Sequence, residues 1–334
     1  MAAQTTVDDL LRDWFAAVSP NWSPTTVRQN RSIVDRHLSP KLGGHRLSTL
    51  RTEDIDLFYG QLRRSGGRGG HSLTAGTVHR IHVVLHGALA QALRWEWLWV
   101  NPATNASAPR CEPTAIYPPS PEDVNRLLDH VARVNPDFHA FLSLAVSTGA
   151  RRSQLTALRW SDEDLDRGQI GFLRALLDAP GGPVLRPTKT GRTYRVHLDA
   201  ASRDVFVRHY RRATRRAQNV NANLDRTSFV FSHEPAGGSP WSPNWVTNQF
   251  IAFREQAGVS FRLHDLRHFM ATMMLTAGIP ITTVSARLSH ARTSTTLNVY
   301  AHAIPGGDQY AADALRAILD RTQASPDGMR RAIA

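Results

Sequence analysis

The sequence predicts a mainly α-helical protein with a small β-sheet, an α+β chain that divides into two domains. Apolar residues recur at helical spacing through most of the chain. Alternation of apolar and polar residues, which is typical of strands, is confined to stretches near residues 168–173 and 193–198. A length of 334 residues is sufficient for two domains, and a proline-rich stretch separates two helical regions.

The first domain, residues 1–103, is predicted to consist of four helices. A glycine-rich stretch at 65–70 separates the third helix from the fourth, and it is either a flexible connector or a basic loop that contacts phosphate. We expect the helices to begin at Thr6 or Asp8, after Ser23, near Thr52 and near Thr74. The side chains expected to pack inward include Leu10, Leu11, Trp14, Phe15, Ile55, Leu57, Phe58, Leu62, Val78, Ile81, Leu85, Leu89 and Leu93. For Trp95, Trp97 and Trp99 we expect packing either in the core or between the domains, and not stacking on bases.

Residues 104–119 are predicted to be a linker, because prolines alternate there with small and polar residues. The second domain, residues 120–334, begins at Ser120-Pro121-Glu122-Asp123, a helix start with carboxylates in the first turn. The helix expected at 201–217 is rich in arginine, and it either presents a solvated face or contacts DNA. We expect helices at 122–134, 138–147, 152–158, 201–217 and 244–322, and a short strand at 229–231 within a loop.

Composition narrows the class of protein before any motif is considered. A net charge of +12 and a pI of about 10.9 suit a polyanionic partner. Cys111 is the single cysteine, which excludes an intramolecular disulfide and a cysteine-based zinc cluster. Neither an apolar leader after Met1 nor a run of roughly 18 apolar residues is present, so we expect a cytoplasmic protein that does not enter a membrane.

Lysine is almost absent from the chain, although arginine is abundant. Only Lys41 and Lys189 occur among the 40 cationic residues. Arginine is effectively never deprotonated, whereas a lysine can donate and recover a proton. Lys189, in the motif Pro187-Thr188-Lys189-Thr190-Gly191, is therefore the candidate proton donor. For Lys41, within a turn-like Ser-Pro-Lys-Leu-Gly stretch, an exposed surface position is favoured.

Four further motif pieces follow one another in an order that suits phosphoryl transfer. They are Thr148-Gly149-Ala150-Arg151, His264-Asp265-Leu266-Arg267-His268, Leu288-Ser289-His290 and Thr296-Leu297-Asn298-Val299-Tyr300. Arginines can hold the non-bridging oxygens of a phosphate in place of a metal. His264 and Arg267 lie one helical turn apart and can face one ligand. A tyrosine phenol, with an ordinary pKa of about 10, can then be the nucleophile if the site supplies positive charge.

Together these pieces resemble the tyrosine recombinases, the phage-integrase family, over nearly the whole chain. The resemblance implies that Arg151 and Arg267 clamp the scissile phosphate and that Tyr300 attacks it. His264 then helps to accept the phenol proton, and His290 hydrogen-bonds a phosphoryl oxygen. His268 and His302 match flanking histidines, for which at most a supporting role is expected. Two positions depart from the family pattern: Gln154 replaces the usual glutamate, and Ser289 replaces the usual glycine.

The resemblance also implies a function, which is site-specific recombination of duplex DNA. The first domain corresponds to the family's four-helix core-binding domain and the second to its catalytic domain. Cleavage through a 3′-phosphotyrosine and a Holliday junction needs no cofactor and no metal. The implied partners are double-stranded recombination sites, a homotetramer assembled on DNA and accessory DNA-bending or directionality proteins. The protein would be nucleoid-associated in a bacterial host.

Several alternatives remain open at this point. An integrase of a mobile element is favoured over a Xer-like chromosome dimer resolvase. A non-catalytic DNA-binding relative fits less well, because all six candidate catalytic residues are present: Arg151, Lys189, His264, Arg267, His290 and Tyr300. A type IB topoisomerase uses similar chemistry, but the clamp domain and the C-terminal helix favour recombination over relaxation of supercoils. An apolar stripe at the C-terminus, Ala311, Ala314, Leu315, Ile318 and Leu319, either packs on its own domain or docks on a neighbouring protomer.

Overall fold

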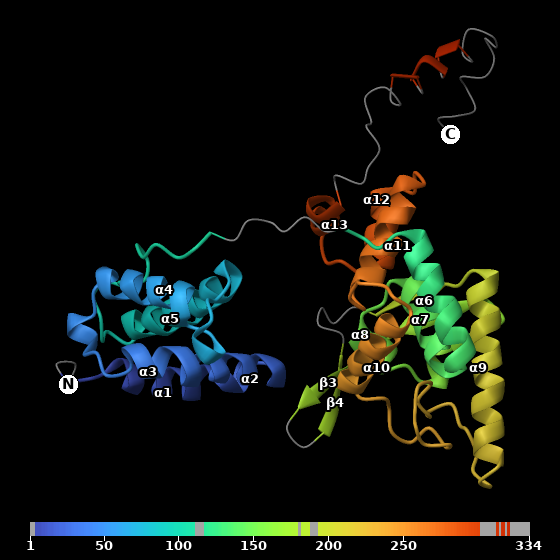
Figure 1. Cartoon of the computed structure of the whole chain (residues 1–334), viewed down its shortest axis with the longest axis horizontal. Helices are drawn as coiled ribbons and strands as arrows, with labels where there is room; N and C mark the ends of the chain where they lie inside the picture. Colours follow the sequence, from blue (N-terminus) through green and yellow to red (C-terminus); the bar gives the residue numbers. More distant parts are fainter. Residues whose placement is uncertain are drawn as a thin grey trace. The chain divides into compact units, whose positions relative to one another are not determined.

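The computed structural model describes residues 4–110, 117–179, 182–187 and 193–300, together with helical positions 312–313, 315–317 and 319–320. The chain divides into two compact units, Met1–Ala115 and Ile116–Ala334, which are coloured blue to teal and teal to red in Figure 1. Both units are mainly helical, and two small antiparallel sheets lie in the second. The predicted fold class is therefore confirmed. In the described part of the chain, no helix is long and apolar enough to cross a membrane.

The four predicted helices of the first unit begin where the sequence predicts, and a fifth helix of a single turn, Ser39–Leu42, lies where a turn was expected. Thr6 caps the first helix by accepting a hydrogen bond from the Asp9 amide, and Ser23 and Thr74 cap two others in the same way. A π-helical stretch, Val34–Leu38, continues the second helix without a break. The helices are α1 (Val7–Val18), α2 (Pro24–Ile33), α3 (Ser39–Leu42), α4 (Thr52–Ser65) and α5 (Ala75–Arg94).

Two apolar side chains of this unit, Leu57 and Leu93, are exposed, although the sequence pattern placed them inside. Leu57 is two positions from Ile55, and this separation turns it to the opposite face of α4. Leu93 lies in the last turn of α5, where Ala92 takes the buried position. Trp99 lies beyond the end of α5 and is exposed, whereas Trp95 and Trp97 pack against the core as expected.

The second unit is built from eight described helices. The predicted helix over 152–158 is wrong in its length, because α8 is a single turn that ends in a turn at Thr156. The helices are α6 (Pro121–Val134), α7 (Pro136–Thr148), α8 (Arg152–Leu155), α9 (Ala200–Gln218), α10 (Pro243–Gln256), α11 (Asp265–Thr276), α12 (Ile281–Arg287) and α13 (Thr293–Tyr300).

The two predicted strands exist and pair with each other. β2 (Gln169–Phe172) lies between β1 (Glu163–Asp164) and β5 (Tyr194–His197) in an antiparallel sheet. A second hairpin of β3 (Arg174–Ala179) and β4 (Gly182–Pro187) was not predicted. The predicted strand at 229–231 is wrong: Phe229 forms only an isolated bridge, and Val230 and Phe231 are buried in the core instead.

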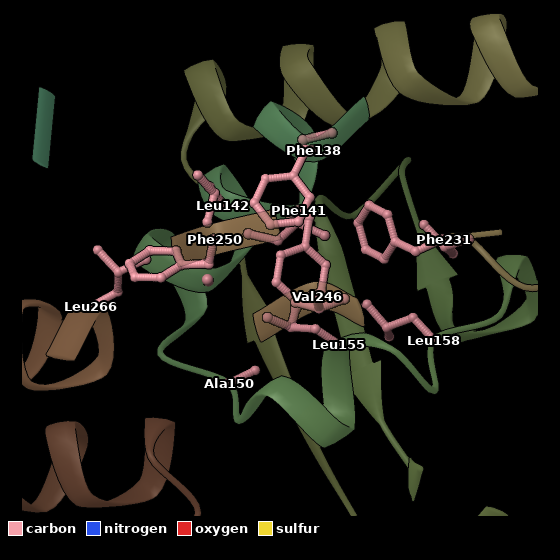
Figure 2. Packing of buried hydrophobic residues seen from close by; sticks show 14 of the residues in the cluster. Phe138, Phe141, Leu142, Ala150, Leu155, Leu158, Phe231, Val246, Phe250 and Leu266 are labelled. Atoms are coloured by element: carbon pink, nitrogen blue, oxygen red, sulfur yellow. The ribbon is translucent and has the colours of Figure 1, made fainter. Parts of the chain in front are cut away.

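Helix α7 is the centre of the second unit and is apolar on most of its surface. Phe138 and Phe141 stack with their centroids 5.7 Å apart, and Phe231 and Phe250 pack around them (Figure 2). The helix ends at Gly149, whose φ of +63° is left-handed. The left-handed backbone favours glycine, and a Cβ here would also lie 2.1 Å from the end of the Met270 side chain, which would have to move. This turn directs the chain toward Arg151.

The basic helix α9 is attached to α7 by charged contacts. Asp137 accepts a hydrogen bond from Arg212 Nε at 2.9 Å, contacts His209 Nδ1 at 3.0 Å and pairs with Arg216. Burial alone would raise the pKa of Asp137, but His209 and the two arginines outweigh it and hold the pKa well below its ordinary value. Part of the predicted basic run therefore stabilises the fold.

We expect Asp137→Asn to lower the free energy of unfolding by about 2 kcal/mol, because hydrogen bonds to charged partners contribute about 1.5–3 kcal/mol each. Since the folded pKa lies below the unfolded one, the contribution is complete above about pH 4 and is lost as the pH falls further. Urea unfolding at pH 7 measures the loss. Asp129→Asn, at an exposed position of α6, is the matched control. Equal stability of the two variants would contradict the prediction.

Candidate active site

Residues from three separate segments meet around the C-terminal end of α7. Arg151 follows this helix, His264 and Arg267 lie at the start of α11, and His290 and Tyr300 flank α13. Arg151, His264 and Arg267 line one cavity of about 420 Å³, while Arg267 contacts His290. The structure thus brings five of the six sequence-predicted residues together. Lys189 lies outside the described residues.

Arg267 connects the segments through its guanidinium group. Its Nη1 donates to the Gly149 carbonyl oxygen at 2.6 Å, and Nη2 donates to the Leu288 carbonyl oxygen at 2.6 Å. The side chain is only 4% exposed, and it forms no ion pair in the described part of the chain. Burial first, and then the charge of Arg151, lower its pKa to about 10. It remains a cation at neutral pH, compensated by carbonyl dipoles and not by a carboxylate.

Arg151 is the N-cap residue of α8, and it forms no ion pair with any of the described residues. The floor of the neighbouring cavity is apolar and includes Phe141, Phe250 and Leu266, whereas its rim carries Arg152 and Arg262. Two candidate catalytic arginines line this cavity, and no carboxylate does among the described residues, so the site favours negative charge. An anion such as a phosphodiester suits it.

His290 is held on both ring nitrogens. A guanidinium can only donate, so Nε2 accepts from Arg267 Nη2 at 3.0 Å. Nδ1 therefore carries the hydrogen and donates it to the Thr296 hydroxyl at 2.8 Å. Partial burial, followed by the charges of Arg267 and Arg151, lowers the pKa of His290 to about 4. The imidazole is neutral at pH 7.

Tyr300 is 1% exposed and packs with Met270, Leu275, Val284 and Leu288. Burial raises the pKa of its phenol to about 12, against the opposing effect of Arg267. Its hydroxyl lies 2.7 Å from His268 Nδ1. The phenol is thus neutral and hydrogen-bonded inside an apolar cluster.

His268 is the contact that sequence reasoning underrated. The family resemblance implies that His264 helps to accept the phenol proton and that His268 has at most a supporting role, but His268 is the histidine that touches the Tyr300 hydroxyl. His264 packs edge-on against His268 with 5.1 Å between the ring centroids. Desolvation and its cationic neighbours lower the pKa of His264 to about 4, and burial also lowers that of His268. The i to i+4 spacing of the two histidines was the signal for this pairing.

The two departures from the family pattern occupy defined positions. Gln154 accepts a hydrogen bond from the Arg151 backbone amide at 3.0 Å, which fixes the start of α8. Ser289 has a φ of +50°, in the left-handed region where glycine is unstrained. The chain therefore keeps the turn before His290 with a residue that adopts it at some cost.

The chain is similar in sequence to proteins of known families. The Phage integrase family profile matches residues 120–305, and the Phage integrase, N-terminal SAM-like domain profile matches residues 6–62. A tyrosine recombinase XerC-like protein of Caldanaerobacter subterraneus subsp. tengcongensis is 24% identical, covering 93% of this chain and 82% of the relative.

Solved structures of integrases share the fold. The Tn1549 transposon integrase in complex with a circular intermediate DNA has a TM-score of 0.75 at 18% identity, over 95% of this chain and 99% of that one. A lambda integrase tetramer bound to a Holliday junction has a TM-score of 0.62 at 16% identity, over 88% of this chain and 77% of that one.

The two neutral histidines predict a pH-dependent stability. His264 and His290 have folded pKa values of about 4 against an ordinary value of 6.5. Between these values the unfolded chain binds more protons, so the free energy of unfolding falls as the pH is lowered from about 6.5 to 4. We expect His264→Gln/His290→Gln to flatten this decrease in urea unfolding at pH 7, 6 and 5. His197→Gln, at an exposed strand position, is the control. An unchanged slope in the double variant would count against the assigned pKa values.

Proposed function

Because the chain belongs to the phage integrase family, we propose that it is an integrase-type tyrosine recombinase, which cleaves and rejoins duplex DNA through a 3′-phosphotyrosine and a Holliday junction. The observation that carries the proposal is the convergence of a phenol, neutral imidazoles and two arginines at one place, with His268 2.7 Å from the Tyr300 hydroxyl. Tyr300 is the nucleophile in this proposal.

The two arginines bind the scissile phosphate. Arg151 has no ion pair to break among the described residues, and Arg267 is held by two carbonyl groups with its charge uncompensated by a carboxylate. Their charges supply the stabilisation of the phosphoryl oxygens that a metal ion supplies in other phosphoryl transferases. His290 joins the clamp once Nε2 carries a hydrogen, through a change of tautomer or uptake of a proton, and Nε2 then donates to a phosphoryl oxygen in place of its contact with Arg267.

Proton transfer needs one base and one acid. His268 and His264 have lowered pKa values, so they are neutral at pH 7 and can accept the phenol proton. Lys189 donates a proton to the leaving 5′-oxygen. The phosphotyrosine bond keeps the energy of the phosphodiester, so a 5′-hydroxyl of a second strand rejoins the DNA without a cofactor.

Strand exchange between two sites requires several protomers, and we propose a homotetramer on double-stranded recombination sites. The tetrameric lambda integrase supports this stoichiometry through its shared fold. The C-terminal apolar stripe is proposed to dock on a neighbouring protomer, in the manner of a helix in a groove. The first unit is proposed to clamp the DNA, in the cytoplasm of a bacterial host and on its nucleoid. Accessory DNA-bending or directionality proteins complete the proposed assembly.

We propose that the protein recombines the DNA of a mobile genetic element. The structural likeness to a transposon integrase covers almost the full length of both chains. A Xer-like chromosome dimer resolvase is the second candidate, and it is favoured by the XerC-like relative. Recombination assays with element ends and with chromosomal dimer-resolution sites separate the two.

Tyr300→Phe is expected to abolish covalent capture of DNA while binding stays within about twofold, because the ring still fills its apolar site. Suicide substrates nicked near the cleavage position trap the phosphotyrosine and are read on denaturing gels. Tyr210→Phe, on α9, is the matched control and should capture DNA normally. A covalent adduct formed by the Tyr300→Phe variant at the wild-type rate would transfer the nucleophile to another residue.

Lys189→Arg is expected to slow cleavage by about 100-fold, since general acid catalysis typically contributes 10²–10⁴-fold and arginine does not release its proton. A 5′-bridging phosphorothiolate has a leaving group that needs no proton. It should restore cleavage by the variant to near the wild-type rate. Lys41→Arg is the control and should behave as wild type on both substrates. Failure of the rescue would mean that Lys189 binds DNA and is not the acid.

A further inference from the structure

Tyr194 lies next to the phosphate clamp, although the proposed mechanism does not use it. It is the first residue of β5 and pairs with Phe172 of β2, on which its ring stacks at a centroid distance of 5.1 Å. This stacking fixes the ring on the sheet and directs the hydroxyl toward α8. The Tyr194 hydroxyl lies 3.2 Å from Gln154 Oε1.

Gln154 receives two hydrogen bonds on one oxygen. The Arg151 backbone amide can only donate, so the atom 3.0 Å away is the amide oxygen of Gln154. The same oxygen therefore accepts from the Tyr194 hydroxyl. Gln154 is 3% exposed, and water does not replace either donor easily.

The start of α8 depends on this oxygen more than the start of a longer helix would. Helix α8 spans only Arg152–Leu155, a single turn, and such a short helix is not stable by itself. The Gln154 side chain closes the turn back onto the Arg151 amide. The direction in which the Arg151 guanidinium leaves the backbone is thereby set.

Tyr194 lies close to the charged groups of the candidate active site. Burial raises the pKa of Tyr194, and the nearby Arg267, Arg151 and Arg287 act in the opposite direction. The phenol remains a neutral donor at pH 7. A neutral amide at position 154 matches this neutral donor, and the pair supplies hydrogen bonding where the family usually has a carboxylate.

We propose that Tyr194 is a positioning residue, which holds Arg151 in its phosphate-binding geometry through the oxygen of Gln154. The inference rests on the proposed function, because it assumes that Arg151 binds the scissile phosphate. Tyr194 itself touches neither the phosphate nor Tyr300 in this proposal.

The test compares cleavage of a normal phosphodiester with cleavage of a methylphosphonate at the same position. The methylphosphonate is neutral, so it needs less of the charge that Arg151 supplies. Tyr194→Phe removes one hydroxyl and keeps the stacked ring. We expect it to slow single-turnover cleavage of the phosphodiester roughly three- to tenfold, the range for one hydrogen bond. On the methylphosphonate the loss should be under about twofold. Tyr210→Phe is the matched control and should be unaffected on both substrates.

A second variant removes the acceptor of the same hydrogen bond instead of its donor. Gln154→Met removes the shared acceptor and should show the same preference for the neutral substrate. The double variant should lose no more than Gln154→Met alone, because both changes act through one oxygen. This variant also decides the question if Tyr194→Phe lowers the melting temperature of the full chain.

Each other outcome overturns the inference. Equal losses on both substrates mean a general structural role, and no loss means that Tyr194 is dispensable. Rescue by a 5′-bridging phosphorothiolate in place of the methylphosphonate means that Tyr194 acts on the proton donor. Arg151→Ala is run in parallel: if the methylphosphonate does not favour this variant either, the proposed role of Arg151 fails, and the fault lies with the proposed function.

Discussion

A buried guanidinium that has no carboxylate partner among the described residues is the constraint on which the site depends. Arg267 joins the end of α7, through the Gly149 carbonyl, to the end of α12, through the Leu288 carbonyl. Carbonyl dipoles compensate the buried charge only in part, since desolvation of a cation is costly. A bound anion would therefore compensate the remaining positive charge of Arg267. The same contacts that hold three segments together also prepare them for a phosphate.

Gly149 makes this link possible. Its left-handed φ ends α7 abruptly, and a side chain there would collide with Met270 of α11. The carbonyl oxygen of Gly149 faces Arg267, and Arg151 follows two residues later. One turn thus places both arginines, and the apolar core around α7 keeps the turn in place (Figure 2). Packing and catalysis are therefore not separable in this part of the molecule.

The sequence was sufficient for features encoded locally and insufficient for those set by tertiary contacts. Capping residues such as Thr6 and Ser23 located helix starts, because the cap and its amide lie within one turn. The contact between His268 and Tyr300 joins segments 32 positions apart and has no local signal. The β3–β4 hairpin was missed because the exposed β4 strand lacks apolar alternation. Buried Phe231 explains the opposite error, since an apolar triplet fits a core loop as well as a strand.

In the proposed mechanism, burial acts in opposite ways on the nucleophile Tyr300 and on the phosphate-binding Arg267. A phenol with a pKa of about 12 is ionised only to about one part in 10⁵ at pH 7. Its burial makes Tyr300 inert, whereas the burial of Arg267 increases the affinity of the site for an anion. His268 connects the two, because it is neutral and already holds the hydroxyl whose proton must leave. A bound phosphate adds negative charge beside these histidines and raises their pKa values, which strengthens them as bases when substrate is present. In the proposed mechanism the site thus couples proton acceptance to phosphate binding, and the phenol is activated only when a phosphodiester is bound.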